Sequence, residues 1–195
     1  TGTRAFNLDY RGVNNIKNLK NLTDEELMSM VAKDHLDEMR ILYERYHQWI
    51  YNFFIQMIRD KDICEDLMQT TFYKAIKYRK SYQGGKFDSW IFRIARNLSY
   101  DYFKTQKKQY QNEDHTIIQQ IKEDEEDTND DIIKLKMVMQ KLTPEEREII
   151  VLSRFQEMCY LQIAEVLGST ENAIKIKVHR TLKKLKKLFF ESVEI

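Results

Sequence analysis

Lysines and arginines crowd one stretch near the C-terminus, and their density suits contacts with nucleic-acid phosphates. From 171 to 190, seven of them stand against a single acid, Glu171. Just before this stretch, Gly168 can adopt the left-handed conformation that ends a helix, and Ser169 or Thr170 can cap the helix that follows. A short helix, a turn and a cationic helix form a helix-turn-helix, whose second helix enters the DNA major groove. An ordinary amphipathic helix with a solvated basic face is the alternative.

The cationic helix has two distinct sides when its residues are placed at helical spacing. An apolar stripe that contains Ile174, Val178 and Leu185 would face a core. The opposite side would be free to meet DNA, and it carries Asn172, Lys175, Ile176, His179 and Lys183. The sequence therefore predicts a DNA-reading face on this helix.

Cations and aromatic rings are mixed in a second stretch, residues 81–110. Six lysines and arginines there stand against two acids, Asp88 and Asp101. On a helix, one face would carry Ser89, Arg93, Arg96, Asn97, Tyr100 and Lys104. Stacking of an unpaired base on an aromatic ring contributes about 1–3 kcal/mol, which is comparable with the cost of opening a base-pair step. Such a face favours melted DNA, although rings such as Trp90 and Phe103 could equally serve only to pack a helical bundle.

A third set of polar residues is acidic. Between 62 and 78 the sequence predicts a helix that turns Ile63, Leu67 and Ala75 inward. Four polar residues share its exposed side, namely Asp62, Glu65, Asp66 and Gln69. The sequence therefore predicts an acidic exposed patch on this helix.

The elements that carry these residues are predicted to be helices throughout. The chain has 195 residues, 42% of them hydrophobic, but only 5 glycines and 1 proline. Long patterns with a 3.6-residue period and almost no alternating runs indicate an all-α protein. Two capping boxes, Thr23 with Glu26 and Thr143 with Glu146, predict helix starts, and Pro144 suits the first position of the second one. One long helix is expected from about residue 36 to residue 58.

Charge and composition divide the chain into segments. An N-terminal extension or tag remnant is expected at 1–22, a helical bundle at 23–110 and a helix-turn-helix domain at 132–195. Between the two domains, residues 111–131 hold nine acids and one lysine, which is the composition of a flexible linker. The predicted architecture is an N-terminal bundle and a C-terminal helix-turn-helix domain joined by this acidic linker.

Catalytic, metal-binding and membrane-spanning functions are disfavoured by the sequence. The histidines are scattered along the chain, at His35, His47, His115 and His179, and no glycine-rich phosphate loop accompanies them. Cys64 and Cys159 lack the spacing of metal ligands. No apolar run approaches the roughly 18 residues of a membrane span, and the N-terminal region lacks a signal-peptide pattern. We expect a cytoplasmic, non-enzymatic protein without cofactors or bound metal.

Three motifs resemble the first conserved domain of bacterial RNA polymerase sigma factors of the extracytoplasmic-function group, in the sigma-70 superfamily. They lie at residues 43–46, 62–72 and 87–97. The helix-turn-helix resembles the second conserved domain of that family. Together the two resemblances cover about residues 23–190 in the family's order and spacing, a combination far more specific than either motif alone.

The resemblance implies a role for each predicted surface. The acidic helix would bind core RNA polymerase through Asp62, Glu65, Asp66, Gln69 and Phe72. The second stretch would bind the minus-ten promoter element, with a base-catching loop at about residues 81–88, through Lys86, Phe87, Trp90, Arg93, Arg96, Asn97, Tyr100 and Lys104. The cationic helix would bind the minus-thirty-five element through Thr170, Glu171, Asn172, Lys175, Ile176, Lys177, His179, Arg180 and Lys183.

The resemblance also implies partners and a location. The partners are core RNA polymerase, promoter DNA and an anti-sigma factor, which in this family is often membrane-anchored and would hold the chain at the inner membrane face without direct membrane insertion. Ile176 departs from the family's common serine, and it could touch a thymine methyl or merely pack.

The function implied is that of a sigma factor, which directs core polymerase in promoter recognition, DNA melting and transcription initiation. The alternative is a stand-alone helix-turn-helix regulator that binds duplex DNA as a dimer. The acidic patch and the cationic aromatic face discriminate between the two, because such a regulator needs neither.

Overall fold

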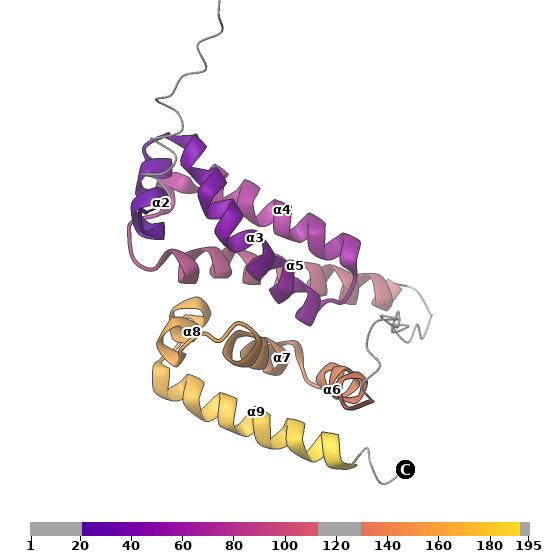
Figure 1. The fold of residues 1–195 in the computed structure, drawn as a ribbon. Helices are drawn as coiled ribbons and strands as arrows, with labels where there is room; N and C mark the ends of the chain where they lie inside the picture. The colour runs from indigo at the N-terminus through magenta and orange to yellow at the C-terminus, as the bar shows by residue number, and fades with distance from the viewer. Residues whose placement is uncertain (1–20, 113–129, 192–195) are drawn as a thin grey trace, which may run out of the picture.

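The computed structural model describes residues 21–112 and 130–191. Within these ranges the only regular elements are helices, and they form two layers that lie one against the other (Figure 1). The prediction of an all-α protein is confirmed. Most of the predicted N-terminal extension and of the predicted acidic linker lies outside the described residues.

The first layer is a bundle built around one long central helix. Its elements are α2 (Asp24–Ala32), η1 (Leu36–Glu38), α3 (Met39–Met57), α4 (Lys61–Lys77), η2 (Arg79–Ser81) and α5 (Phe87–Asn112). The helix expected from residue 36 to residue 58 is thus a short 3-10 turn followed by α3. The central helix buries Ile50, Phe53 and Phe54 completely. The ring of Phe53 packs edge-on against Phe92 of α5, with the ring centroids 5.7 Å apart.

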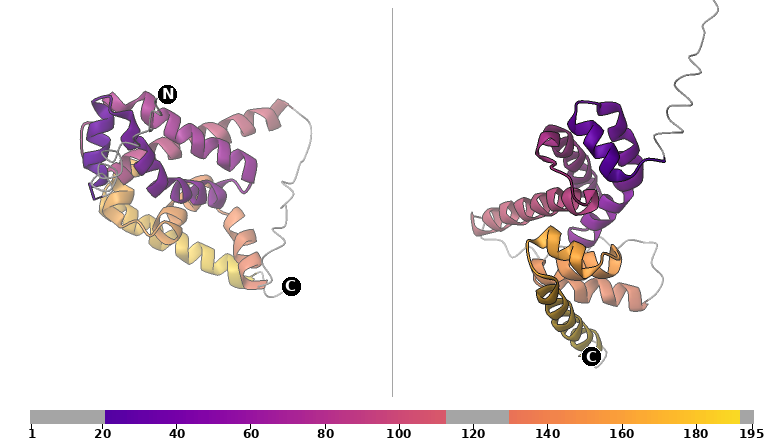
Figure 2. Two further views of the ribbon diagram at one scale, coloured as in Figure 1. Left: turned by 45° about the horizontal axis from the view of Figure 1, so that its top comes forward. Right: turned by 90° about the vertical axis from the view of Figure 1, so that its left-hand side faces the viewer.

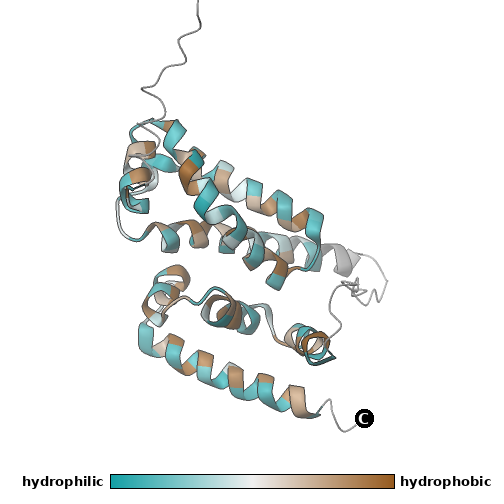
Figure 3. Cartoon of the chain, in the orientation of Figure 1, coloured by the Kyte–Doolittle hydropathy of each residue, from teal (hydrophilic) through white to brown (hydrophobic). Residues whose placement is uncertain are grey.

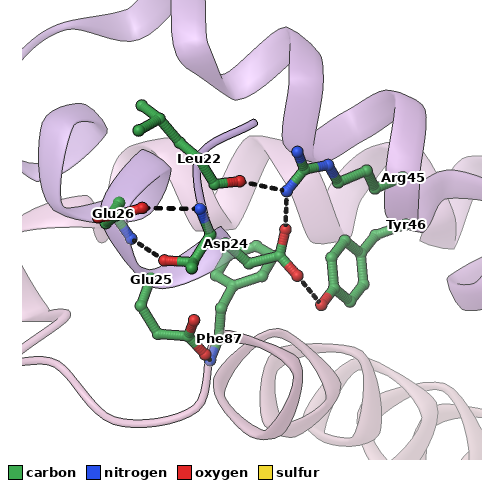
Figure 4. Close-up of polar contacts among 8 residues, drawn as sticks. Leu22, Asp24, Glu25, Glu26, Arg45, Tyr46 and Phe87 are labelled. Atoms are coloured by element: carbon green, nitrogen blue, oxygen red, sulfur yellow. Dashed lines mark hydrogen bonds and ion pairs between the residues drawn. The ribbon is translucent and has the colours of Figure 1, made fainter. Parts of the chain in front are cut away.

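The capping box at the start of α2 is present, and the adjacent Asp24 ties this helix to α3. The Thr23 amide donates to Glu26, and the Glu26 amide donates to the Thr23 hydroxyl. Asp24 forms an ion pair with Arg45 and accepts a 2.6 Å hydrogen bond from the buried Tyr46 hydroxyl (Figure 4). Burial, and secondarily the bond to Asp24, raise the pKa of Tyr46 well above its ordinary value, so its hydroxyl stays a donor.

Tyr46→Phe is expected to lower the free energy of unfolding by about 1.5 kcal/mol, the value of a hydrogen bond to a charged group. The change leaves the ring in place and removes only the donor to Asp24. Urea unfolding measures the effect. Tyr73→Phe is the matched control, because the Tyr73 side chain is 63% exposed and should change stability by less than about 0.5 kcal/mol. Equal stability of Tyr46→Phe and the wild type would contradict the role given to this bond.

The second layer contains α6 (Asp130–Gln140), α7 (Pro144–Ile150), the π-helical turn η3 (Val151–Phe155), α8 (Tyr160–Leu167) and α9 (Glu171–Glu191). The second predicted capping box is present at the start of α7, with Thr143, Pro144 and Glu146 in the expected roles. Gly168 ends α8 in the left-handed conformation, at φ 61°, as expected for a helix stop. The turn between α8 and α9 therefore follows from the local sequence.

The two layers are packed together rather than held apart. Helix α5 lies against α8, and α3 contacts η3 and α7 (Figure 2). The Arg147 side chain of α7 donates to the carbonyl oxygen of Met57 at the end of α3, at 2.9 Å. Arg59 donates to the carbonyl oxygen of Lys136 in α6, at 2.6 Å. Nearly all buried apolar side chains of both layers belong to one continuous cluster.

Candidate polymerase and nucleic-acid interfaces

The acidic surface is formed by Asp62, Glu65, Asp66 and Gln69 on α4, and all four side chains are exposed. The helix starts at the N-cap Asp60, whose carboxylate accepts from the Ile63 amide at 3.1 Å. Cys64, Met68 and Ala75 bury the opposite side of the helix. The amphipathic spacing thus separates the acids from the core.

Two aromatic residues of α4 lie differently from the sequence-based expectation. Phe72, predicted to contact polymerase, is only 5% exposed and packs edge-on against the Tyr43 ring at 4.8 Å. Its apolar ring therefore packs between α4 and α3 and does not form part of the exposed side of α4. Tyr73, which the prediction omitted, is exposed one turn after Gln69 and prolongs the acidic surface. Tyr73 could have been predicted to be exposed, because it lies four residues after Gln69 and therefore on the same side of the helix.

The loop before α5 is held in one shape by a buried tyrosine. The Tyr82 hydroxyl donates to the carbonyl oxygen of Gly85 at 2.6 Å, and its ring meets Trp90 edge-on at 5.5 Å. Gly84 and Gly85 have φ angles of 89° and 86°, which side-chain-bearing residues rarely adopt. Lys86 is exposed at the end of this loop.

The predicted minus-ten face comprises Arg93, Arg96, Asn97, Tyr100 and Lys104 of α5. Arg93, Asn97 and Lys104 are exposed, and the Arg96 guanidinium lies over the Tyr100 ring, 4.7 Å from its centroid. Two residues expected in this region are core residues instead. Phe87, predicted to bind the minus-ten element, is fully buried against the Tyr46 ring, and Ser89 is 3% exposed. Spacing placed Ser89 on the exposed face, whereas only the family resemblance placed Phe87 among the minus-ten residues.

Part of the minus-ten face is engaged by the second layer. Arg93 donates to the carbonyl oxygen of Glu165 in α8 at 2.8 Å. Arg96 forms an ion pair with Glu148 of α7, with Nε and Oε1 3.0 Å apart. Glu148 is 2% exposed. Burial raises the pKa of Glu148 to about 7, and the neighbouring Arg96 offsets only part of that rise.

The predicted reading face of α9 comprises Asn172, Lys175, Ile176, His179, Arg180 and Lys183, all exposed. Ile174, Val178 and Thr181 bury the other side, and polar and apolar residues alternate along the helix accordingly (Figure 3). The Thr170 hydroxyl accepts from the Ala173 amide at 3.3 Å, so Thr170 caps the helix. Glu171 and Lys177 are exposed beside it. Ile176 is 51% exposed, so it does not pack into the core.

A hollow of about 380 Å³ lies beside the reading face. Its lining adds two residues that sequence reasoning missed, Arg154 from η3 and Tyr160 from the start of α8. The remaining lining residues come from α9, namely Lys175, Ile176, Val178, His179, Arg180 and Leu182. Arg154 adds a cation to those of α9. No periodic pattern connects Arg154 with α9, because the two elements meet only in the folded domain.

Comparisons with known proteins identify both layers. The family model for Sigma-70 region 2 matches residues 42–109, and the model for Sigma-70, region 4 matches residues 132–185. The ECF RNA polymerase sigma factor SigM of Bacillus subtilis is 28% identical over 156 residues, which cover 78% of this chain and 95% of SigM. The chain belongs to the extracytoplasmic-function group of RNA polymerase sigma factors.

Further similarities to this sigma factor come from sequence and from solved structures. The RNA polymerase sigma factor CarQ of Myxococcus xanthus is 27% identical over 165 residues, covering 80% of this chain and 91% of CarQ. The sigma factor RpoE of Bartonella quintana, solved in complex with the anti-sigma factor NepR, has a TM-score of 0.66 at 25% identity. That match covers 76% of this chain and 94% of RpoE. CnrH, solved with the cytosolic domain of CnrY, has the same fold, with a TM-score of 0.68 at 20% identity over 86% of this chain and 97% of CnrH.

Membership of this family settles the general function. The sigma factor directs promoter recognition and transcription initiation by RNA polymerase, and it is not an enzyme. No group of three metal-ligating side chains could hold an ion among the residues that the structure describes. None of the described helices is long and apolar enough to cross a membrane.

Proposed function

We propose that the sigma factor divides promoter recognition among three separate surfaces. The acidic surface of α4 docks on core RNA polymerase, the minus-ten face of α5 with the loop before it holds melted DNA, and the reading face of α9 binds the minus-thirty-five duplex. The observation that supports this proposal most strongly is that the four polar residues of the acidic surface are exposed together on one side of α4. The charge of this surface is negative, whereas that of the two DNA-binding faces is positive. A DNA-binding regulator acting alone has no use for such a surface.

The chemistry of the other two faces matches the form of DNA assigned to each. On α5, the ring of Tyr100 and the guanidinium of Arg96 offer flat surfaces beside cations, which suits unstacked bases and their phosphates. On α9, exposed Lys175 and Arg180 flank Ile176, which suits phosphates and a thymine methyl in a major groove. Arg154 and Tyr160 extend the α9 site toward the neighbouring DNA backbone.

The order of the segments along the chain completes the proposed organisation. Residues 23–110 and 132–195 act as the two DNA-contacting domains, and the acidic segment 111–131 tethers them. The tether raises the effective concentration of each domain near its promoter element once the other has bound. Core polymerase and promoter DNA then place the site of action in the cytoplasm.

An anti-sigma factor is the third proposed partner. The relatives solved with such proteins, RpoE with NepR and CnrH with the cytosolic domain of CnrY, support this assignment. An anti-sigma factor that spans the membrane would hold the sigma factor at the inner membrane face.

The proposed function is tested by reconstitution with purified core polymerase. We expect the chain and core polymerase together to initiate at promoters upstream of the transcripts that its overproduction induces. The chain alone is expected to bind the same duplexes at least about tenfold more weakly, because without polymerase its two DNA-binding faces are not held at the positions of the two promoter elements. In vitro transcription and electrophoretic mobility shift measure the two quantities. Tight, sequence-specific binding in the absence of polymerase would favour the stand-alone regulator instead.

A further inference from the structure

The contacts between the two layers involve residues that promoter DNA would need. Arg93 and Arg96 both belong to the minus-ten face, and both are bound to the C-terminal domain, Arg93 by the Glu165 carbonyl oxygen and Arg96 by the Glu148 carboxylate. Only 25% of the Arg96 side chain is exposed. Arg93, Asn97 and Lys104 of the same face stay exposed, so the C-terminal domain partly covers Arg96 and binds one donor of Arg93 without burying its side chain.

The groups that hold these arginines resemble a nucleic-acid backbone in their chemistry. A carboxylate and a carbonyl oxygen are hydrogen-bond acceptors with negative or partial negative charge, as phosphate oxygens are. They lie about one helical turn apart along α5, because Arg93 and Arg96 are three residues apart. Glu165 therefore occupies a donor of Arg93, and Glu148 pairs with the charge of Arg96, at groups that would otherwise contact DNA.

A third polar contact closes the same interface at the start of α5. The Gln162 amide nitrogen donates to the Asp88 carboxylate at 2.6 Å. The Gln162 amide oxygen accepts from the Cys159 amide, which gives α8 its capping bond. The two partners demand one orientation of the Gln162 amide, since Asp88 needs a donor and the Cys159 amide needs an acceptor. Asp88 lies at the end of the loop assigned to the minus-ten element, so this bond also restrains that loop.

We infer that the C-terminal domain masks the minus-ten face of the free sigma factor, with Glu148, Glu165 and Gln162 as an intramolecular competitor of promoter DNA. This inference rests on the proposed role of α5. The masking must be reversible, because the reading face of α9 and the minus-ten face have to reach separate promoter elements. The burial of Glu148 is consistent with a reversible contact. Removing its carboxylate from water costs free energy, and this cost offsets much of the attraction between Glu148 and Arg96.

The Gln162–Asp88 bond offers a variant that opens the interface with little risk to folding. Gln162→Glu keeps an oxygen acceptor for the Cys159 amide and sets a second carboxylate against Asp88. Combining it with Asp88→Asn restores the hydrogen bond with donor and acceptor exchanged. The new amide nitrogen at position 88 can donate to the carboxylate at position 162, and its amide oxygen can still accept from the Ser89 amide. Gln48→Glu is the charge-matched control, because Gln48 is an exposed residue of α3. All four proteins are compared as full-length chains.

The experiment measures compactness and DNA binding together. Small-angle X-ray scattering gives the radius of gyration, and fluorescence anisotropy gives the affinity for a labelled single-stranded 20-nucleotide DNA of random sequence. We expect Gln162→Glu to increase the radius of gyration and to bind the single strand about tenfold more tightly, the weight of one hydrogen bond to a charged group. The double variant should have the radius of gyration and the single-strand affinity of the wild type. The Gln48→Glu control should also match the wild type in both quantities.

Two results would overturn the inference. One is a Gln162→Glu protein as compact as the wild type with unchanged affinity for the single strand. The other is a protein that opens without gaining affinity. Initiation by the wild type with core polymerase is scored separately. Failure to initiate would count against the proposed function. The changes in radius of gyration and in single-strand affinity, and their reversal in the double variant, would still test the contact between the two domains.

Discussion

Glu65→Lys combined with Asp66→Lys is expected to weaken binding to core RNA polymerase by about 100-fold. Both acids are exposed in the middle of the acidic surface, and reversal of their charge converts attraction into repulsion at a docking site that would be desolvated on binding. Neither residue belongs to the first turn of α4, so the substitutions do not oppose the helix dipole there. Titration of labelled sigma factor with purified core polymerase, without DNA, measures the affinity.

A control of equal charge comes from Asp37→Lys combined with Asp101→Lys. These acids are also exposed in the first layer, but they lie on η1 and α5. The control is expected to bind polymerase within about twofold of the wild type, because screened long-range charge contributes little. Equal losses in both double variants would mean that net charge, and not the acidic surface, determines the affinity. Wild-type affinity in the α4 variant would remove this surface from the proposed docking site.

Lys175→Ala combined with Arg180→Ala is expected to weaken binding to duplex promoter DNA by about 100-fold and to flatten its salt dependence. Each lost phosphate contact should reduce the slope of log K against log salt by about 0.9, so the pair should reduce it by about 2. Both side chains are exposed on α9, and the burial of Ile174 and Val178 is unaffected. Stability should therefore stay within about 0.5 kcal/mol of the wild type.

The salt slope is measured with the polymerase-bound sigma factor on a duplex that ends upstream of the minus-ten element. Lys33→Ala combined with Lys141→Ala removes the same charge from exposed positions outside α9. We expect the control to keep the wild-type slope. A slope unchanged by the α9 substitutions would mean that neither cation contacts phosphate, and the reading face would then have to be reassigned.

The elements of the fold could be predicted because their signals are local. Thr23 with Glu26, Thr143 with Glu146, and Gly168 all act within three or four residues of a helix end. The outward faces of α4 and α9 followed from the same short-range periodicity, since residues three or four apart share a side of a helix. Six exposed side chains on the predicted reading face show how well that rule works for a helix packed on one side only.

Sequence spacing is less informative where a helix is packed on more than one side. It placed Ser89 on the exposed side of α5, yet Ser89 is 3% exposed. Phe72 and Phe87, which only the family resemblance placed at interfaces, are covered by rings from another helix, Tyr43 and Tyr46 respectively. Periodicity assigns one apolar stripe to a helix, and it cannot say how wide that stripe is. The width depends on how many neighbours surround the helix, which is a property of the bundle.

Sequence by itself determined the helices, their caps, the charge of each exposed face and, through the order and spacing of its motifs, the sigma-factor family. Only the tertiary structure decided that the minus-ten face lies against the C-terminal domain, where Arg93 meets Glu165 and Gln162 meets Asp88. Those partners are 72 and 74 residues apart in the chain. Local patterns encode which side of a helix avoids water, but not which distant surface will cover it, because that choice is made by the packing of whole domains.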